Sequence, residues 1–138
     1  MIRKILLVLS VLLVIAFTAC TSSDVNLLSD PAMSGLSGKY SKVYIKMEKI
    51  NDFGTIYLND EKVLYAEYKN REAYTDWVDV TDKLNSGANT FHFVLENPWN
   101  SGSGLFMVKA DEEILFSHFR SRIRANGVLY DETITLNW

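Results

Sequence analysis

Cysteine and histidine are scarce in this chain, whose 138 residues include one cysteine and two histidines. Because Cys20 has no second cysteine to pair with, no internal disulfide can form, and a catalytic thiol or a thiolate metal site is disfavoured. His92 and His118 lie on different predicted strands, without the spaced carboxylates that would complete a zinc site. The sequence therefore predicts neither a metal nor a cofactor, and each histidine is interpreted as an outward or partly buried strand residue.

The short motifs of common catalytic sites are also missing. No Gly-x-Ser-x-Gly turn presents a nucleophilic serine. Gly102-Ser103-Gly104 lacks the lysine of a phosphate-binding loop and falls in a predicted loop between strands rather than before a helix. Composition alone does not exclude a Ser-His-Asp triad, but the pattern predicts a protein that is not an enzyme.

Positive charge is too sparse for a nucleic-acid-binding protein. The chain has 14 basic and 17 acidic residues, and removing Arg3 and Lys4 with a leader leaves 12 against 17, a net charge of −5. Binding to a phosphate backbone requires clustered cations. One basic group, Arg120, Arg122 and Arg124, alternates along a strand-like stretch, and a solvated strand face near a sheet edge is favoured over an anion or lipid-headgroup site.

The longest hydrophobic run lies at the N-terminus. Arg3 and Lys4 precede an apolar stretch over 5–17 that is interrupted only by Ser10. This stretch is shorter than the roughly 20 residues of a transmembrane helix, and small residues follow it, so a signal peptide is predicted over 1–19. An ordinary secreted protein and an N-terminal anchor helix are the alternatives.

Phe17-Thr18-Ala19-Cys20 resembles the bacterial lipobox, although leucine is usual where Phe17 stands. The resemblance implies that Cys20 becomes the lipid-modified first residue of a mature lipoprotein, whose acyl chains hold it at a membrane. Thr21 follows Cys20 where aspartate commonly signals retention in the inner membrane. The resemblance therefore implies a lipid-anchored protein of the cell envelope, in the outer membrane if the source is Gram-negative.

The chain after the lipobox divides into a tether and one domain. Residues 20–38 are rich in Ser, Asp, Asn and Gly, contain Pro31, and show no period that would bury a face, which is typical of a flexible tether. Residues 39–138 suffice for one hydrophobic core.

Alternating apolar residues predict an all-β domain. Val43, Ile45 and Met47 share one strand face, and Phe91, Phe93 and Leu95 share another. Asn59-Asp60 favours a type I′ hairpin, and the apolar stretch over 105–110 predicts a central strand. Further strands are expected over 56–58, 63–68, 77–80, 114–119 and 133–138. The pattern predicts a two-sheet antiparallel β-sandwich.

Two stretches carry a more specific resemblance. The first is Asp79-Val80-Thr81, then Leu84, Gly87-Ala88-Asn89 and an alternating strand over 91–97; the second is the hairpin over 56–63. Together they resemble the galactose-binding-like jelly-roll β-sandwich of many carbohydrate-binding modules, over roughly residues 40–138. The resemblance implies an architecture more firmly than an activity, because this fold also serves protein binders and structural domains.

Two loops have the residue types of a sugar site. Such sites place aromatic rings against the sugar ring and polar side chains against its hydroxyls. Trp99 could instead be a lid over the end of the sandwich, and the tyrosines could be packing residues. The candidate ligand-binding residues are Asn97, Trp99 and Asn100 in one loop and Tyr68, Arg71 and Tyr74 in the other. A non-catalytic, carbohydrate-binding lipoprotein is therefore the leading hypothesis, and a lipoprotein that binds envelope proteins through a sheet face or edge is the alternative.

Overall fold

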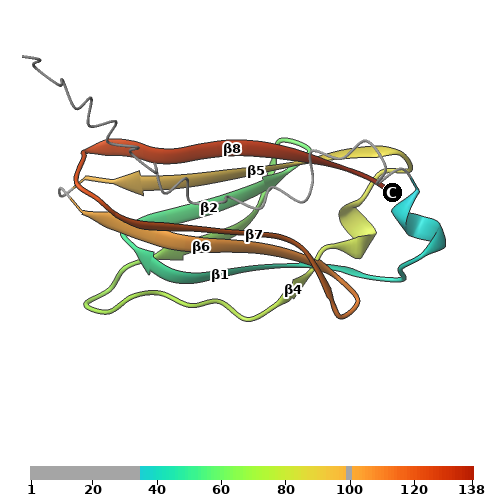
Figure 1. The fold of residues 1–138 in the computed structure, drawn as a ribbon, viewed down its shortest axis with the longest axis horizontal. Helices are drawn as coiled ribbons and strands as arrows, with labels where there is room; N and C mark the ends of the chain where they lie inside the picture. Colours follow the sequence, from blue (N-terminus) through green and yellow to red (C-terminus); the bar gives the residue numbers. More distant parts are fainter. Residues whose placement is uncertain (1–34, 99–100) are drawn as a thin grey trace, which may run out of the picture.

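The computed structural model describes residues 35–98 and 101–138 (Figure 1). Cys20, the predicted signal peptide and all of the tether before Gly35 lie outside the described residues, as do Trp99 and Asn100. Within the described part, no helix is long and apolar enough to cross a membrane.

The described residues form eight strands and two short 3₁₀ turns. They are η1 (Leu36–Gly38), β1 (Val43–Asn51), β2 (Phe53–Leu58), β3 (Glu61–Glu67), β4 (Val78–Asp79), η2 (Thr81–Lys83), β5 (Ala88–Asn97), β6 (Gly102–Ala110), β7 (Glu113–Ile123) and β8 (Gly127–Asn137). One sheet has the order β4-β1-β6-β7 and the other β3-β2-β5-β8, and the neighbouring strands in both sheets are antiparallel. The two layers lie face to face, which confirms the predicted all-β, two-sheet antiparallel sandwich (Figure 1).

The chain path has the character of a jelly roll. β1 pairs with β6 in one sheet, and the strands that adjoin them in sequence, β2 and β5, pair in the other. The β1–β2 and β5–β6 segments therefore run together across both layers. β6 is flanked by β1 and β7, which confirms that the apolar stretch over 105–110 is an internal strand.

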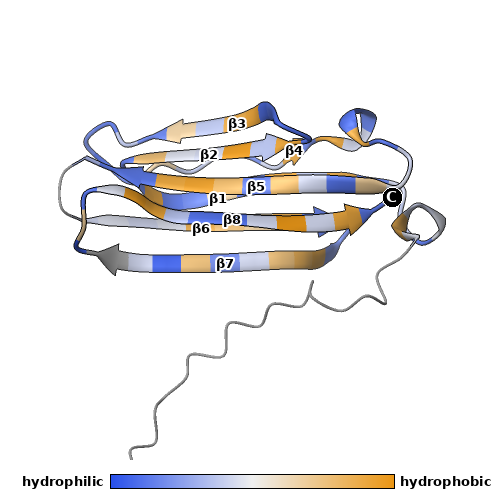
Figure 2. Ribbon diagram, turned by 90° about the horizontal axis from the view of Figure 1, so that it is seen from above, coloured by the Kyte–Doolittle hydropathy of each residue, from blue (hydrophilic) through white to orange (hydrophobic). Residues whose placement is uncertain are grey.

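The core lies between the sheets and follows the predicted alternation. Phe91, Phe93 and Leu95 are fully buried, while Thr90 and Glu96 on the other face of β5 are exposed. Figure 2 shows the resulting bands of hydrophobic and hydrophilic residues along β5. Aromatic rings join the layers, since Phe93 stacks on Phe116 of β7 with centroids 4.8 Å apart. Burial of this apolar face is the main force that specifies the register of β5.

Both ends of the described chain contribute to this core. Leu36 of η1 is buried with the core residues, so the folded part begins before residue 39. At the other end Trp138 is partly buried against the core, and its backbone exchanges hydrogen bonds with Gly87. Asn59 and Asp60 both have positive φ, as the predicted type I′ turn requires.

Two glycines that the sequence placed in a loop belong to a strand instead. Gly102 and Gly104 belong to β6 and are buried. A Cβ atom at Gly102 would lie 2.2 Å from Leu129 Cδ1, and one at Gly104 would lie 2.9 Å from Ile50 Cδ1. Glycine is needed here because other elements approach closely, so the prediction that 102–104 form a loop was wrong.

Candidate functional site

The corner between β1 and β2 has an unusual backbone. Asp52, the single residue between these strands, has φ 103°, and Lys49 within β1 has φ 53° where the register of β1 against β6 shifts. Positive φ is uncommon for residues other than glycine, and such strain is concentrated at functional sites. This corner is therefore a candidate binding site.

The long connection from β3 to β4 passes beside this corner and is held by β1. The backbones of Ile50 and Ala73 exchange two hydrogen bonds, of 3.1 and 2.9 Å. Thr75 N donates to Met47 O, and Thr75 Oγ1 accepts from Met47 N at 3.0 Å. The connection thus continues the edge of the sheet before β4. These contacts hold residues 68–74 at the end of the sandwich where the β1–β2 corner lies, here called the loop end.

Two shallow grooves adjoin this connection. The first, here called the loop groove, has a volume of about 560 Å³ and is lined by Glu67, Lys69, Arg71, Glu72, Ala73 and Tyr74. The second, the corner groove, has a volume of about 480 Å³ and is lined by Asn51, Asp52, Tyr68, Lys69, Asn70 and Ser101. Lys69 lines both, and each has a size ordinary for a small-ligand site.

The corner groove contains a poorly compensated carboxylate. Asp52 is 4 % exposed, and its Oδ2 is buried without a hydrogen-bond partner among the described residues. Burial raises the pKa of the Asp52 carboxyl above its ordinary value. Asn51 Nδ2 donates to Ser101 O at 3.1 Å, which fixes that side chain at the junction of two loops. No local sequence pattern indicates this site, because Asp52 follows an ordinary strand pattern.

The described candidate residues do not all lie at the surface. Tyr68 lines the corner groove, while Arg71 and Tyr74 line the loop groove, and Tyr74 is 57 % exposed. Asn97 is 1 % exposed, and its Nδ2 donates to Ala125 O at 3.0 Å, so its side chain joins the end of β5 to the β7–β8 connection. The candidates Trp99, Asn100 and Cys20 lie outside the described residues.

A third groove lies where the outer face of the β3-β2-β5-β8 sheet meets the loop end. It has a volume of about 400 Å³, and Phe53, Tyr65, Glu96, Asn97, Pro98 and Gly127 line it. The rings of Phe53 and Tyr65 stack with centroids 6.4 Å apart and an interplanar angle of 17°. This aromatic pair was not among the sequence candidates, although Phe53 and Tyr65 occupy outward positions of paired strands.

A polar cluster lies between the edge strands β7 and β8. The rings of His118 and Tyr130 stack with centroids 4.5 Å apart, and the Tyr130 hydroxyl donates to Glu132 Oε2. His118 Nδ1 lies 3.7 Å from the same oxygen, and the Arg120 guanidinium carbon lies 5.2 Å from the Tyr130 ring centre. β7 is an edge strand, as the arginine pattern suggested, but Arg120 is partly buried and covers Tyr130. Period-two spacing from Phe116 places His118 and Arg120 on the inner face, and this was the available signal.

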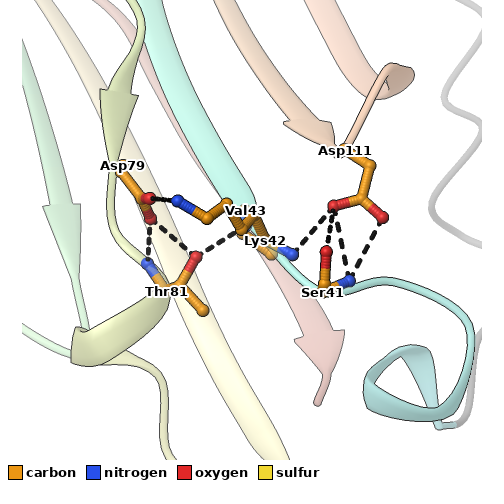
Figure 3. A network of polar contacts seen from close by, with 6 residues as sticks. All are labelled: Ser41, Lys42, Val43, Asp79, Thr81 and Asp111. Carbon is orange, nitrogen blue, oxygen red and sulfur yellow. Dashed lines mark hydrogen bonds and ion pairs between the residues drawn. The ribbon is translucent and has the colours of Figure 1, made fainter.

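At the end of the sandwich opposite the loop end, polar contacts join the start of β1 to the β4–η2 segment and to the β6–β7 turn (Figure 3). Asp79 Oδ1 accepts hydrogen bonds from Thr81 Oγ1 at 2.6 Å and Thr81 N at 3.0 Å, and its Oδ2 accepts from Lys42 Nζ at 2.9 Å. Asp111 accepts from the backbone of Ser41 and Lys42. Hydrogen bonds from Thr81, then from Lys42, lower the pKa of Asp79 to about 2. These carboxylates have their partners, and their role is structural.

The described residues contain no group of three or more His, Cys, Asp or Glu side chains that could hold a metal ion. No protein-family model matches the chain, and comparison with curated proteins and with solved structures finds no similar protein.

Proposed function

We propose that the chain is a lipid-anchored envelope protein of a bacterium, and that its β-sandwich is a non-catalytic domain that binds a glycan. The N-terminal part of the proposal rests on the sequence, in which an apolar run leads to Phe17-Thr18-Ala19-Cys20. The two-layer antiparallel architecture supports the further proposal of a galactose-binding-like fold, on which ligand sites are formed by loops.

One observation carries the glycan proposal. Tyr68, Arg71 and Tyr74, which lie in one connection, line two adjoining grooves at the loop end. Exposed aromatic rings offer apolar faces to a sugar ring, while Arg71 and Glu72 offer a donor and an acceptor for hydroxyl groups. Because the grooves are shallow, the loss of ligand freedom offsets much of the contact energy, and dissociation constants in the micromolar to millimolar range are expected.

The test is binding of the full-length chain to a glycan array and to cell-wall polysaccharide. Tyr74→Ala should reduce binding at least tenfold, equivalent to about 1.4 kcal/mol, with little change in melting temperature. Phe119→Ala is the matched control, because Phe119 is a 50 % exposed ring on β7 that lines none of the three grooves. If wild type binds no glycan, or if both variants lose binding equally, the glycan proposal fails.

The alternative function is binding of an envelope protein by a sheet face or edge. The observation in its favour is that β7, an edge strand, bears Ile114 at 44 % and Phe119 at 50 % exposure. Edge strands with exposed apolar side chains are suited to pairing with a strand of another protein. Under this function Phe119→Ala, rather than Tyr74→Ala, should weaken capture of a partner from envelope extracts.

A further inference from the structure

The Asp52 carboxylate lacks the compensation that a buried charge requires. Its Oδ2 has no hydrogen-bond partner among the described residues, and burial alone accounts for the rise in its pKa, without an offsetting cation. A buried carboxylate that is neither paired nor fully hydrogen-bonded destabilises the folded state when it is ionised. In many folded proteins an arginine or a lysine pairs with such a group. Among the described residues of this chain Asp52 has no such ion pair, and it lines a groove whose one lysine, Lys69, lies near Glu67.

The groove is lined by an aromatic residue as well as by this carboxylate. Tyr68 N donates to Asp52 O at 2.7 Å, which ties the start of the β3–β4 connection to the corner. Tyr68 is 37 % exposed and lines the same groove. A carboxylate beside an accessible aromatic ring is a favourable environment for an organic cation, because the ring face attracts positive charge and the carboxylate neutralises it.

The remaining lining residues do not supply that cation. Asn51, Asn70 and Ser101 are neutral, and the ammonium of Lys69 is 3.9 Å from Glu67, on a side chain that is 78 % exposed. The loop groove next to it adds two more carboxylates, Glu67 and Glu72, beside Lys69 and Arg71. Within the corner groove, Asp52 therefore has no ion-pair partner among the described residues.

We propose that the corner groove binds an alkylammonium group, with Asp52 as its counter-charge and Tyr68 as its aromatic contact. A neutral hydroxyl could donate one hydrogen bond to Asp52 but would leave the buried charge uncompensated, so the site favours an ammonium over a hydroxyl. The group could belong to a lysine side chain of a peptide or to an amino sugar. This inference shares Tyr68 and the corner groove with the glycan proposal but does not rest on it, because it requires a charged amine and not a sugar ring.

The test compares ligands that differ only in the charge of the amine. Chemical-shift titrations of the full-length chain would use Nα-acetyl-lysine methylamide and its Nε-acetylated form, and in parallel glucosamine and N-acetylglucosamine. Saturable binding at residues 51–52 and 68–70 is expected for a charged member, with at least tenfold weaker binding of its acetylated partner. If both the lysine derivative and glucosamine bind, the ammonium group alone is recognised. If only one of them binds, the groove also contacts the rest of that molecule.

Variants then assign the contact to Asp52. Asp52→Asn keeps the shape of the side chain and should lose at least tenfold in affinity for the charged ligand. Glu112→Gln is the control and should retain it, because Glu112 is an exposed carboxylate that lines none of the three grooves. Tyr68→Ala provides a second variant and should weaken binding several-fold. Equal binding of charged and acetylated ligands, no binding of either amine, or unchanged affinity in a folded Asp52→Asn protein would overturn the proposal. Should Asp52→Asn not fold, the acetylation pairs and Tyr68→Ala decide.

Discussion

Asn59 and Asn89 hydrogen-bond to each other across two connections, with Asn59 Nδ2 donating to Asn89 Oδ1 at 2.9 Å. Asn89 is fully buried, and its amide also donates to the carbonyls of Asn85 and Gly87. Asn59 in turn accepts from Thr90 N at 3.0 Å. One buried amide therefore holds both the β2–β3 hairpin and the turn that leads into β5, and all its polar atoms are satisfied.

Replacing Asn89 should be costly because several buried polar groups would lose their partners. Asn89→Ala is expected to lower the free energy of unfolding by about 2 to 4 kcal/mol, measured by urea denaturation. Asn85→Ala is the control, since Asn85 contributes only backbone atoms to this network, and it should cost under about 1 kcal/mol. A loss as large in Asn85→Ala as in Asn89→Ala would contradict this account.

The core offers a second comparison between neighbouring residues. Phe93 is fully buried, with Phe106 and Phe116 against its ring, while His92 points to the other face and pairs with Asp131 at 2.7 Å. Phe93→Ala should therefore destabilise by about 3 to 5 kcal/mol, a large fraction of the stability of a small domain. His92→Ala should cost about 1 kcal/mol or less in the same denaturation experiment, because a surface pair contributes little. Comparable losses in the two variants would refute the face assignment.

Local patterns were enough to predict the sheets but not the site. The alternation at Phe91 and Phe93 assigned their faces, because period-two burial is encoded by neighbours in the sequence. Asn89 was recognised only as a turn residue, since its buried role depends on Asn59 in another hairpin. The same holds for Asp52, whose burial depends on how the chain turns between β1 and β2 and on the connection that begins at Tyr68.

The start of a strand and the contacts of a polar residue are also not predictable from local patterns alone. Gly102 resembles a loop residue in sequence, but it pairs with Ile123 in the sheet, and Leu129 of β8 comes so close that a Cβ atom would not fit. Likewise, the sequence around His118 suggests an isolated polar residue, whereas in the structure Tyr130 and Glu132 of β8 contact it. Contacts between residues distant in the sequence decide such cases, and local sequence patterns do not reveal them.

The Asp79 carboxylate should make stability fall in acid. Its pKa in the folded state is lowered from 3.8 to about 2 by Thr81 and Lys42, so the stabilisation is present above roughly pH 4 and is lost as the pH falls through about 2. Asp79→Asn retains an acceptor for Thr81 but removes the charge. The difference in unfolding free energy between wild type and this variant should therefore shrink between pH 5 and pH 2, and more salt should reduce it at neutral pH. A difference that is constant with pH would contradict the assignment.

The lipid anchor is tested in cells. If Cys20 carries acyl chains, Cys20→Ala should lose membrane association, and globomycin, which blocks lipoprotein signal processing, should cause uncleaved precursor to accumulate. Fractionation and immunoblotting of the two proteins measure both effects. Ser23→Ala is a suitable control because it changes a neighbouring residue and leaves the lipobox-like residues intact. Normal processing and membrane retention of Cys20→Ala would refute the lipoprotein proposal.

Asp52 should have the opposite pH dependence to Asp79. Its pKa is raised by burial in the folded state, so the folded protein holds this proton more tightly than the unfolded chain does, and stability falls as the pH rises from the ordinary value near 3.8 through the raised pKa. Asp52→Asn removes the ionisation while keeping a residue type that tolerates positive φ. The variant should therefore be more stable than wild type at pH 7, with the advantage disappearing near pH 3, as followed by urea denaturation across this range. Glu72→Gln, a change at an exposed carboxylate, should show no such trend. An Asp52→Asn protein less stable than wild type at pH 7 would mean that the carboxylate is compensated within the fold, and the same result would remove the main reason to expect a cation in the corner groove.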